Sequence, residues 1–214
     1  MSLPNVPIGI RAVIFDFGGV ICFPPTSEQW QEAAAFSGTS GDRLYEAFWK
    51  HRNEYDGGGD AYDYWRGVAK LLGVPFEERV IDGMIEREIA FWSNFDTRVL
   101  AWANELRRAG IRTGMLSNLP RPLGERLRLT PGFADRFDHL TLSYELGVIK
   151  PDRAIYQHAI DGLGIAPHEG LFLDDREENV AGGRAAGLCA ERFVSWDEFV
   201  ARQLGRYLLP RPLS

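Results

Sequence analysis

A short apolar run, RAVIFD at residues 11–16, ends in a carboxylate and is followed within two residues by a pair of glycines. A continuous apolar run of this length is typical of a strand buried on both faces of a parallel sheet. Similar runs occur at 111–118, 139–145 and 170–175, with a weaker one at 188–194. Helical patterns separate the later runs, at 96–110, 152–164 and 177–187. The alternation predicts an α/β fold with a doubly wound parallel sheet.

One long segment, residues 24–94, lacks this alternation and contains only helical patterns. It is too long for a simple connection between two strands. We therefore expect an all-helical cap domain at 24–94, inserted into a core domain formed by residues 1–23 and 95–214.

Composition excludes several classes of protein. A formal net charge of −6 argues against a nucleic-acid partner. No apolar run approaches the ~18 residues of a membrane span, and the N-terminal residues do not resemble a signal peptide. Cys22 and Cys189 form neither a CxxC pair nor a metal-binding spacing. These features predict a cytoplasmic protein with reduced, buried thiols and no membrane partner.

Polar side chains end the four strongest predicted strands: Asp16, Ser117 with Asn118, Lys150 just beyond the third strand, and Asp174 with Asp175. Because the carboxyl ends of parallel strands meet at one edge of a sheet, these side chains would converge on one cleft. Three carboxylates so close repel one another and favour a divalent cation, and Mg²⁺ suits carboxylates, water and a phosphate. Each group also has an alternative interpretation without a metal or ligand. Asp174 and Asp175 could cap a helix, Lys150 could be a solvated surface charge, and Ser117 with Asn118 could form an ordinary turn.

Four segments, IFDFGGV, MLSN, GVIKPDRAIYQHAI and LFLDDREEN, resemble in order and separation the four motifs of the haloacid dehalogenase superfamily. The insertion between the first two motifs is similar to the helical cap class of that family. The resemblance implies a Rossmann-like core and a hydrolase that acts on a small phosphorylated metabolite. It also implies that Asp16 is the nucleophile, forming an aspartyl-phosphate that water then hydrolyses.

The same resemblance assigns the residues that bind phosphate. Ser117 matches the phosphate-binding hydroxyl, and Asn118 is its neighbour. Lys150 matches the lysine that stabilises both the nucleophile and the phosphoryl oxygens. The glycines Gly18 and Gly19 leave room for phosphate and metal after the nucleophile.

The metal site implied by the resemblance holds Mg²⁺ between the two acidic motifs. Asp174 and Asp175 match the acidic pair, Asp16 contributes its carboxylate, and Gly18 contributes its backbone carbonyl. Asn179 matches the polar residue that orients the acidic loop.

Gly18 departs from the pattern of most phosphatases of this family, which carry a second aspartate there as general acid and base. Such help is worth ~10²–10⁴ in rate. Three interpretations follow: a Mg²⁺-dependent phosphatase, possibly of a sugar phosphate, whose leaving group depends less on protonation; a metal-independent 2-haloacid dehalogenase; or a non-catalytic phosphate-binding or regulatory protein that has kept the fold. The presence of Asp16, Lys150 and both motif-four acids favours the first.

Substrate choice would depend on the inserted helices. His51, Arg52, Tyr55 and Trp65 surround a triglycine loop and are candidates for contact with a small polar substrate, with packing inside the insert as the alternative. The insert also contains Trp30, Trp49 and Trp92, which would either form its core or face the cleft.

Overall fold

The computed structural model describes residues 8–212, in which five parallel strands form one sheet of order β3-β2-β1-β4-β5. The strands are β1 (Ala12–Phe15), β2 (Arg112–Ser117), β3 (His139–Leu142), β4 (Gly170–Asp174) and β5 (Cys189–Arg192). Val13 of β1 lies opposite Thr113 of β2 and Leu171 of β4. The central position of β1 confirms the doubly wound α/β fold predicted from the apolar runs.

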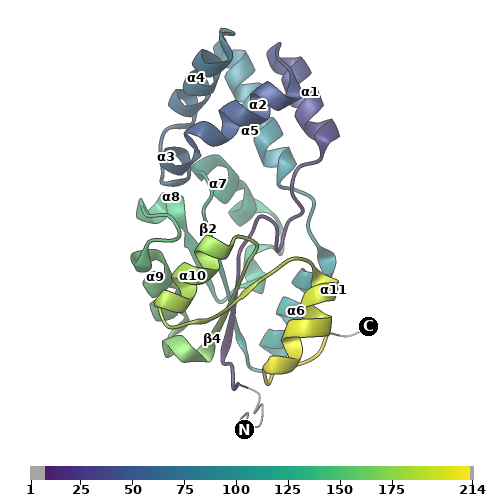
Figure 1. The fold of residues 1–214 in the computed structure, drawn as a ribbon, viewed down its shortest axis with the longest axis vertical. Coiled ribbons are helices and arrows are strands. Elements are labelled where there is room, and N and C mark those ends of the chain that lie inside the picture. The colour runs from purple at the N-terminus through teal and green to yellow at the C-terminus, as the bar shows by residue number, and fades with distance from the viewer. Residues whose placement is uncertain (1–7, 213–214) are drawn as a thin grey trace.

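Helices cover both faces of the sheet (Figure 1). They are α6 (Thr97–Arg108), α7 (Arg121–Leu129), α8 (Ser143–Leu146), α9 (Arg153–Leu163), α10 (Glu177–Ala185) and α11 (Trp196–Glu198), with short turns at Ala134–Arg136, Pro167–Glu169, Phe199–Gln203 and Leu204–Arg206. Successive residues of β1 serve opposite faces, since Ala12 and Ile14 join the cluster under α9 and α10. Val13 and Phe15 join the cluster under α6 and the C-terminal segment.

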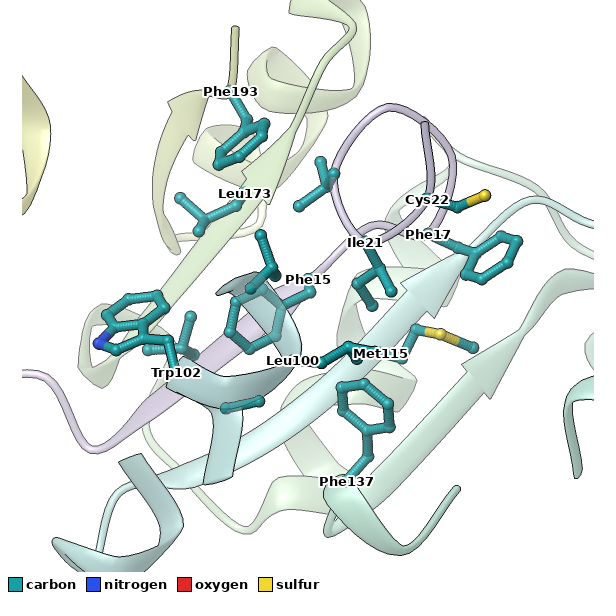
Figure 2. Close-up of a cluster of buried hydrophobic side chains, with 14 of the residues drawn as sticks. Phe15, Phe17, Ile21, Cys22, Leu100, Trp102, Met115, Phe137, Leu173 and Phe193 are labelled. Carbon is teal, nitrogen blue, oxygen red and sulfur yellow. The ribbon is translucent and has the colours of Figure 1, made fainter. Parts of the chain in front are cut away.

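Packing on the α6 face holds β1 firmly. The ring of Phe15 meets Trp102 edge-on at 5.8 Å and Phe137 at 6.4 Å. Figure 2 shows the three side chains together. Burying each such side chain stabilises the fold by about 1.5–3 kcal/mol. Asp16, which follows Phe15, is therefore held by a rigid strand at the carboxyl edge of the sheet.

Five helices between β1 and α6 lie above that edge (Figure 1). They are α1 (Ser27–Ser37), α2 (Gly41–Lys50), α3 (Arg52–Asp56), α4 (Ala61–Leu72) and α5 (Glu78–Phe91). Thr26 begins α1 with a capping box that pairs it with Gln29. The helices share a hydrophobic cluster of their own around Phe48, Trp65 and Met84.

Two sequence-based expectations differ from the structure. The strand expected over 139–145 ends at Leu142, because the buried hydroxyl of Ser143 accepts a hydrogen bond from the amide of Leu119 and the chain turns into α8. The sequence of residues 41–55 has one continuous helical pattern, which predicts a single helix, but the structure divides it at His51, whose ψ of 24° is not helical.

Both cysteines are free, as expected, although Cys189 is half-buried rather than buried. Of the helices between residues 8 and 212, none combines the length and apolar character that crossing a bilayer requires.

Candidate active site

Three buried charged groups meet at the carboxyl edge of the sheet. The Nζ atom of Lys150 lies 2.8 Å from Oδ1 of Asp16 and 2.6 Å from Oδ2 of Asp174. It also donates a hydrogen bond of 3.1 Å to the carbonyl of Leu116. Asp16 is fixed in turn, because its Oδ1 accepts a hydrogen bond of 2.7 Å from the amide of Phe17. The convergence expected from the strand ends is thus present in the structure.

The carboxylates offer a set of ligands that fits a small, hard cation. Asp16, Asp174 and Asp175 each present an oxygen, and these atoms lie within 4.8 Å of one another. Carboxylate oxygens are the ligands that Mg²⁺ prefers in proteins, so Asp16, Asp174 and Asp175 would hold such an ion and balance its charge.

The two acids of the pair differ in what they contact. Both oxygens of Asp174 accept hydrogen bonds, from Lys150 and Asn179 and from the backbone amide of Arg176. Asp175 is half-buried and borders the cavity described below. Asp175 is therefore better placed than Asp174 to give an oxygen to a metal.

Burial perturbs the ionisation of all four charged groups. Burial raises the pKa of Asp16 to about 8, and the carboxylates of Asp174 and Asp175 add to the rise while Lys150 opposes it. Burial also raises the pKa of Asp175, and the nearby charge of Asp174 adds to the rise. Burial disfavours the Asp174 anion too, but Lys150 and the other donors outweigh it and lower that pKa. Burial likewise opposes the Lys150 cation, yet the two carboxylates beside it raise its pKa.

Two asparagines hold these groups in place. Nδ2 of Asn179 lies 3.0 and 3.1 Å from the two oxygens of Asp174 and donates hydrogen bonds to them. Oδ1 of Asn118 accepts a hydrogen bond of 2.7 Å from the amide of Lys150, and its Nδ2 donates to the carbonyl of Lys150 at 3.1 Å. Asn118 therefore contacts the lysine backbone as well as bordering the cavity.

The two glycines after Phe17 are closely packed. Gly19 has a φ of +76°, and a Cβ there would lie 2.6 Å from Oδ2 of Asp175. A Cβ on Gly18 would lie 3.1 Å from the indole ring of Trp92. The space beside position 18 is thus filled by an aromatic ring from the end of α5.

A cavity of about 570 Å³ lies between this edge and the inserted helices. On the core side, Asp16, Gly18, Gly19, Ser117, Asn118, Lys150, Asp175 and Asn179 border it. Trp30, Tyr45, Trp49, Arg52, Asn53, Asp56 and Trp92 border it from the insert.

Of the four candidates around the triglycine loop, Arg52 borders this cavity, and the three tryptophans also named from the sequence, Trp30, Trp49 and Trp92, border it as well. Tyr55 and Trp65 are instead packed inside the hydrophobic cluster of the insert, and His51 borders a separate cavity of about 300 Å³. Tyr45 and Asp56 were missed. The spacing of Asp56 four residues after Arg52 is the sequence signal that could have found their ion pair.

Comparison with known proteins gives a consistent picture. A family model described as haloacid dehalogenase-like hydrolase matches residues 10–187. A sesquiterpene phosphatase from Aspergillus oryzae is 26% identical over 83% of this chain and 87% of its own length. A D-ribitol-5-phosphate phosphatase from Bacteroides thetaiotaomicron is 26% identical over 83% of this chain and 89% of its own.

Solved structures share the fold. An enzyme from Bacteroides thetaiotaomicron, crystallised with magnesium and inorganic phosphate, superposes with a TM-score of 0.69 at 21% identity and covers 86% of this chain and 94% of its own. An L-2-haloacid dehalogenase from Xanthobacter autotrophicus superposes with a TM-score of 0.67 at 24% identity, covering 92% and 82%.

Proposed function

Because the chain belongs to the haloacid dehalogenase-like hydrolases, we propose that it is a Mg²⁺-dependent phosphatase whose nucleophile is Asp16. The observation that carries the proposal is the contact of Lys150 with both Asp16 and Asp174, beside a third carboxylate on Asp175. When all three carboxyls are ionised, they and the one ammonium leave an excess of two negative charges. A divalent cation would balance that excess and so favour the ionised form of Asp16 despite its raised pKa. The two phosphatase relatives support the same reaction class.

In the reaction we propose, an oxygen of Asp16 attacks phosphorus and the bond from phosphorus to the ester oxygen breaks. The leaving alcohol takes a proton from solvent, since Gly18 has no side chain to supply one. Water then attacks phosphorus of the aspartyl-phosphate, which releases phosphate and restores Asp16. Lys150 neutralises Asp16 and the phosphoryl oxygens, and the Ser117 hydroxyl donates to them.

Asp16, Asp175 and, less directly, Asp174 would hold the Mg²⁺, with the carbonyl of Gly18 as the further protein ligand. When bound, the cation neutralises charge on the phosphoryl group as it is transferred. Asn179 keeps the acidic loop in position, and Asn118 does the same for the Lys150 backbone.

We propose that residues 24–94 act as a cap over a core formed by 1–23 and 95–214. The separate hydrophobic cluster of α1–α5 and the cavity between these helices and the sheet support that division. A small phosphorylated metabolite in the cytoplasm is the substrate we expect.

The test is hydrolysis of phenyl phosphate and a panel of phosphomonoesters with added Mg²⁺, with Asp16→Asn as the control. We expect phosphate release that is lost in Asp16→Asn and on chelation, and restored by Mg²⁺. Undiminished activity in excess chelator would overturn the metal assignment. Chloride release from 2-chloropropionate without phosphatase activity would establish the dehalogenase instead. The paired acids speak against that outcome, because they repel a carboxylate substrate.

A further inference from the structure

The side of the cavity formed by the inserted helices is aromatic. Trp30, Tyr45, Trp49 and Trp92 all border it, together with three polar residues, Arg52, Asn53 and Asp56. The rings of Trp30 and Tyr45 are 5.3 Å apart edge-on, and those of Tyr45 and Trp49 are 6.3 Å apart. We call these four side chains the aromatic wall. It faces the same space as Asp16 and Lys150.

Two members of the aromatic wall are exposed although they are large and apolar. Tyr45 is 49% exposed and Trp49 is 39% exposed. Packing within the insert therefore does not account for their position. Exposed aromatic surface that borders a cavity is typical of a binding site that an apolar group fills.

The charged groups in this part of the cavity are already paired. Arg52 is 6% exposed, and its Nε lies 2.8 Å from Oδ1 of Asp56. Its Nη1 contacts Glu88, which is also buried. One cation thus faces two carboxylates, so Arg52 has no uncompensated charge with which to recognise a second anionic group on the substrate. Of the other two cations that border the cavity, Lys150 contacts Asp16 and Asp174, and Arg176 is exposed and pairs with Glu178.

The aromatic wall reaches as far as the nucleophile loop. The indole ring of Trp92 fills the space beside Gly18. Because Gly18 has no side chain, the ring lies directly against the loop that carries Asp16. The alcohol part of a substrate bound at Asp16 would meet aromatic carbon at this point.

From this arrangement we propose that the preferred substrate is a phosphomonoester of an apolar alcohol, whose hydrocarbon or aryl group lies against the aromatic wall. The proposal rests on the proposed phosphatase function and concerns the leaving group alone. It differs from the small polar group expected from the sequence, because the paired charges and exposed rings favour apolar contact.

The test compares two pairs of esters that are matched in chemical reactivity. Octyl phosphate and glycerol 3-phosphate are both primary alkyl esters, and naphthyl phosphate and phenyl phosphate are both aryl esters. We expect kcat/KM to be higher for octyl phosphate than for glycerol 3-phosphate, or higher for naphthyl phosphate than for phenyl phosphate. The first result would indicate recognition of a hydrocarbon chain, and the second recognition of an aryl group. In Trp49→Ala and Tyr45→Ala that preference should fall about tenfold, mainly through KM.

Leu71→Ala provides the matched control, because Leu71 is an exposed apolar residue of α4 that is not among the residues bordering the cavity. It should leave both ratios unchanged. Faster turnover of glycerol 3-phosphate and phenyl phosphate, or ratios unaffected by both aromatic variants, would refute the inference while leaving the phosphatase intact. If none of the four esters is hydrolysed, and acetyl phosphate is not hydrolysed either, both the proposed phosphatase activity and the inference about its substrate are wrong.

Discussion

Replacing Arg52 with Met should destabilise the protein strongly at neutral pH. The guanidinium lies 2.8 Å from Asp56 and also contacts Glu88, and all three groups are buried. At an effective dielectric constant of about 20, one such contact is worth about 6 kcal/mol before the cost of desolvation is subtracted. Removing one partner of a buried pair costs about 3–5 kcal/mol in practice, because the remaining charges stay buried without compensation. We expect a loss in that range.

The loss should depend on pH in a definite direction. Burial raises the pKa of Asp56 to about 6; Arg52 opposes this rise and the carboxylate of Glu88 adds to it. Burial raises the pKa of Glu88 as well. A carboxyl whose pKa is raised by folding destabilises the folded state when ionised, and the cost is relieved as pH falls through the folded-state pKa. Without Arg52 both pKa values rise further, so the defect of Arg52→Met should shrink by half or more between about pH 8 and about pH 5.5.

The measurement is urea unfolding of the wild type and the variant at both pH values. Arg66→Met is the control, because its contact with Asp63 at 3.2 Å joins two exposed side chains. Its effect should stay below about 1 kcal/mol at either pH. A loss under about 1 kcal/mol for Arg52→Met, or one that does not change with pH, would refute the reasoning about uncompensated buried charge.

Two further changes test how the site is held. Asn179→Ala removes both hydrogen bonds to Asp174 and should raise the Mg²⁺ concentration needed for half-maximal activity about 10–100-fold; an unchanged Mg²⁺ titration would contradict that role. Gly19→Ala forces a side chain into a left-handed backbone 2.6 Å from Asp175, so we expect a loss of about 1–2 kcal/mol in chemical denaturation and reduced activity. Gly9→Ala, where nothing lies within 4 Å, should be neutral by both measures.

The sequence predicted the core well because its signals are local. β1 and β4 are buried on both faces, so each is a continuous apolar run that ends at a carboxylate. Parallel pairing then brings Asp16 and Asp174 to one edge whatever the helices contain, while Lys150 reaches them only after the chain has passed through α8.

The cap side of the cavity could not be predicted in the same way. The partner of Arg52 on α5 is 36 positions away, and only helix packing brings Glu88 to it. Trp49 and Trp65 are equally apolar in sequence, yet one borders the cavity and the other is fully buried. The packing of Trp92 against Gly18 likewise depends on where α5 ends in space.

The way the chain passes between the inserted helices and the sheet suggests how the cavity opens. The two crossing segments are hydrogen-bonded to each other, with Phe23 donating to Asn94 at 2.9 Å and Asp96 donating to Ile21 at 2.8 Å. On the opposite side, where α3 meets α8 in Figure 1, the hydroxyl of Ser143 donates to the carbonyl of Asp56 at 2.5 Å.

The paired crossing segments are thus a natural hinge, and the Ser143 hydrogen bond is a latch at the far end. The Ser143 hydrogen bond contributes only about 0.5–1.5 kcal/mol, but opening would also separate Arg126 of α7 from Glu86 of α5 and disturb the packing of Ile89 in the core cluster. We expect phosphate and alcohol to leave when the inserted helices rotate about this hinge. The strength of the Ser143 hydrogen bond should then affect the rate of product release, although Ser143 takes no part in the reaction.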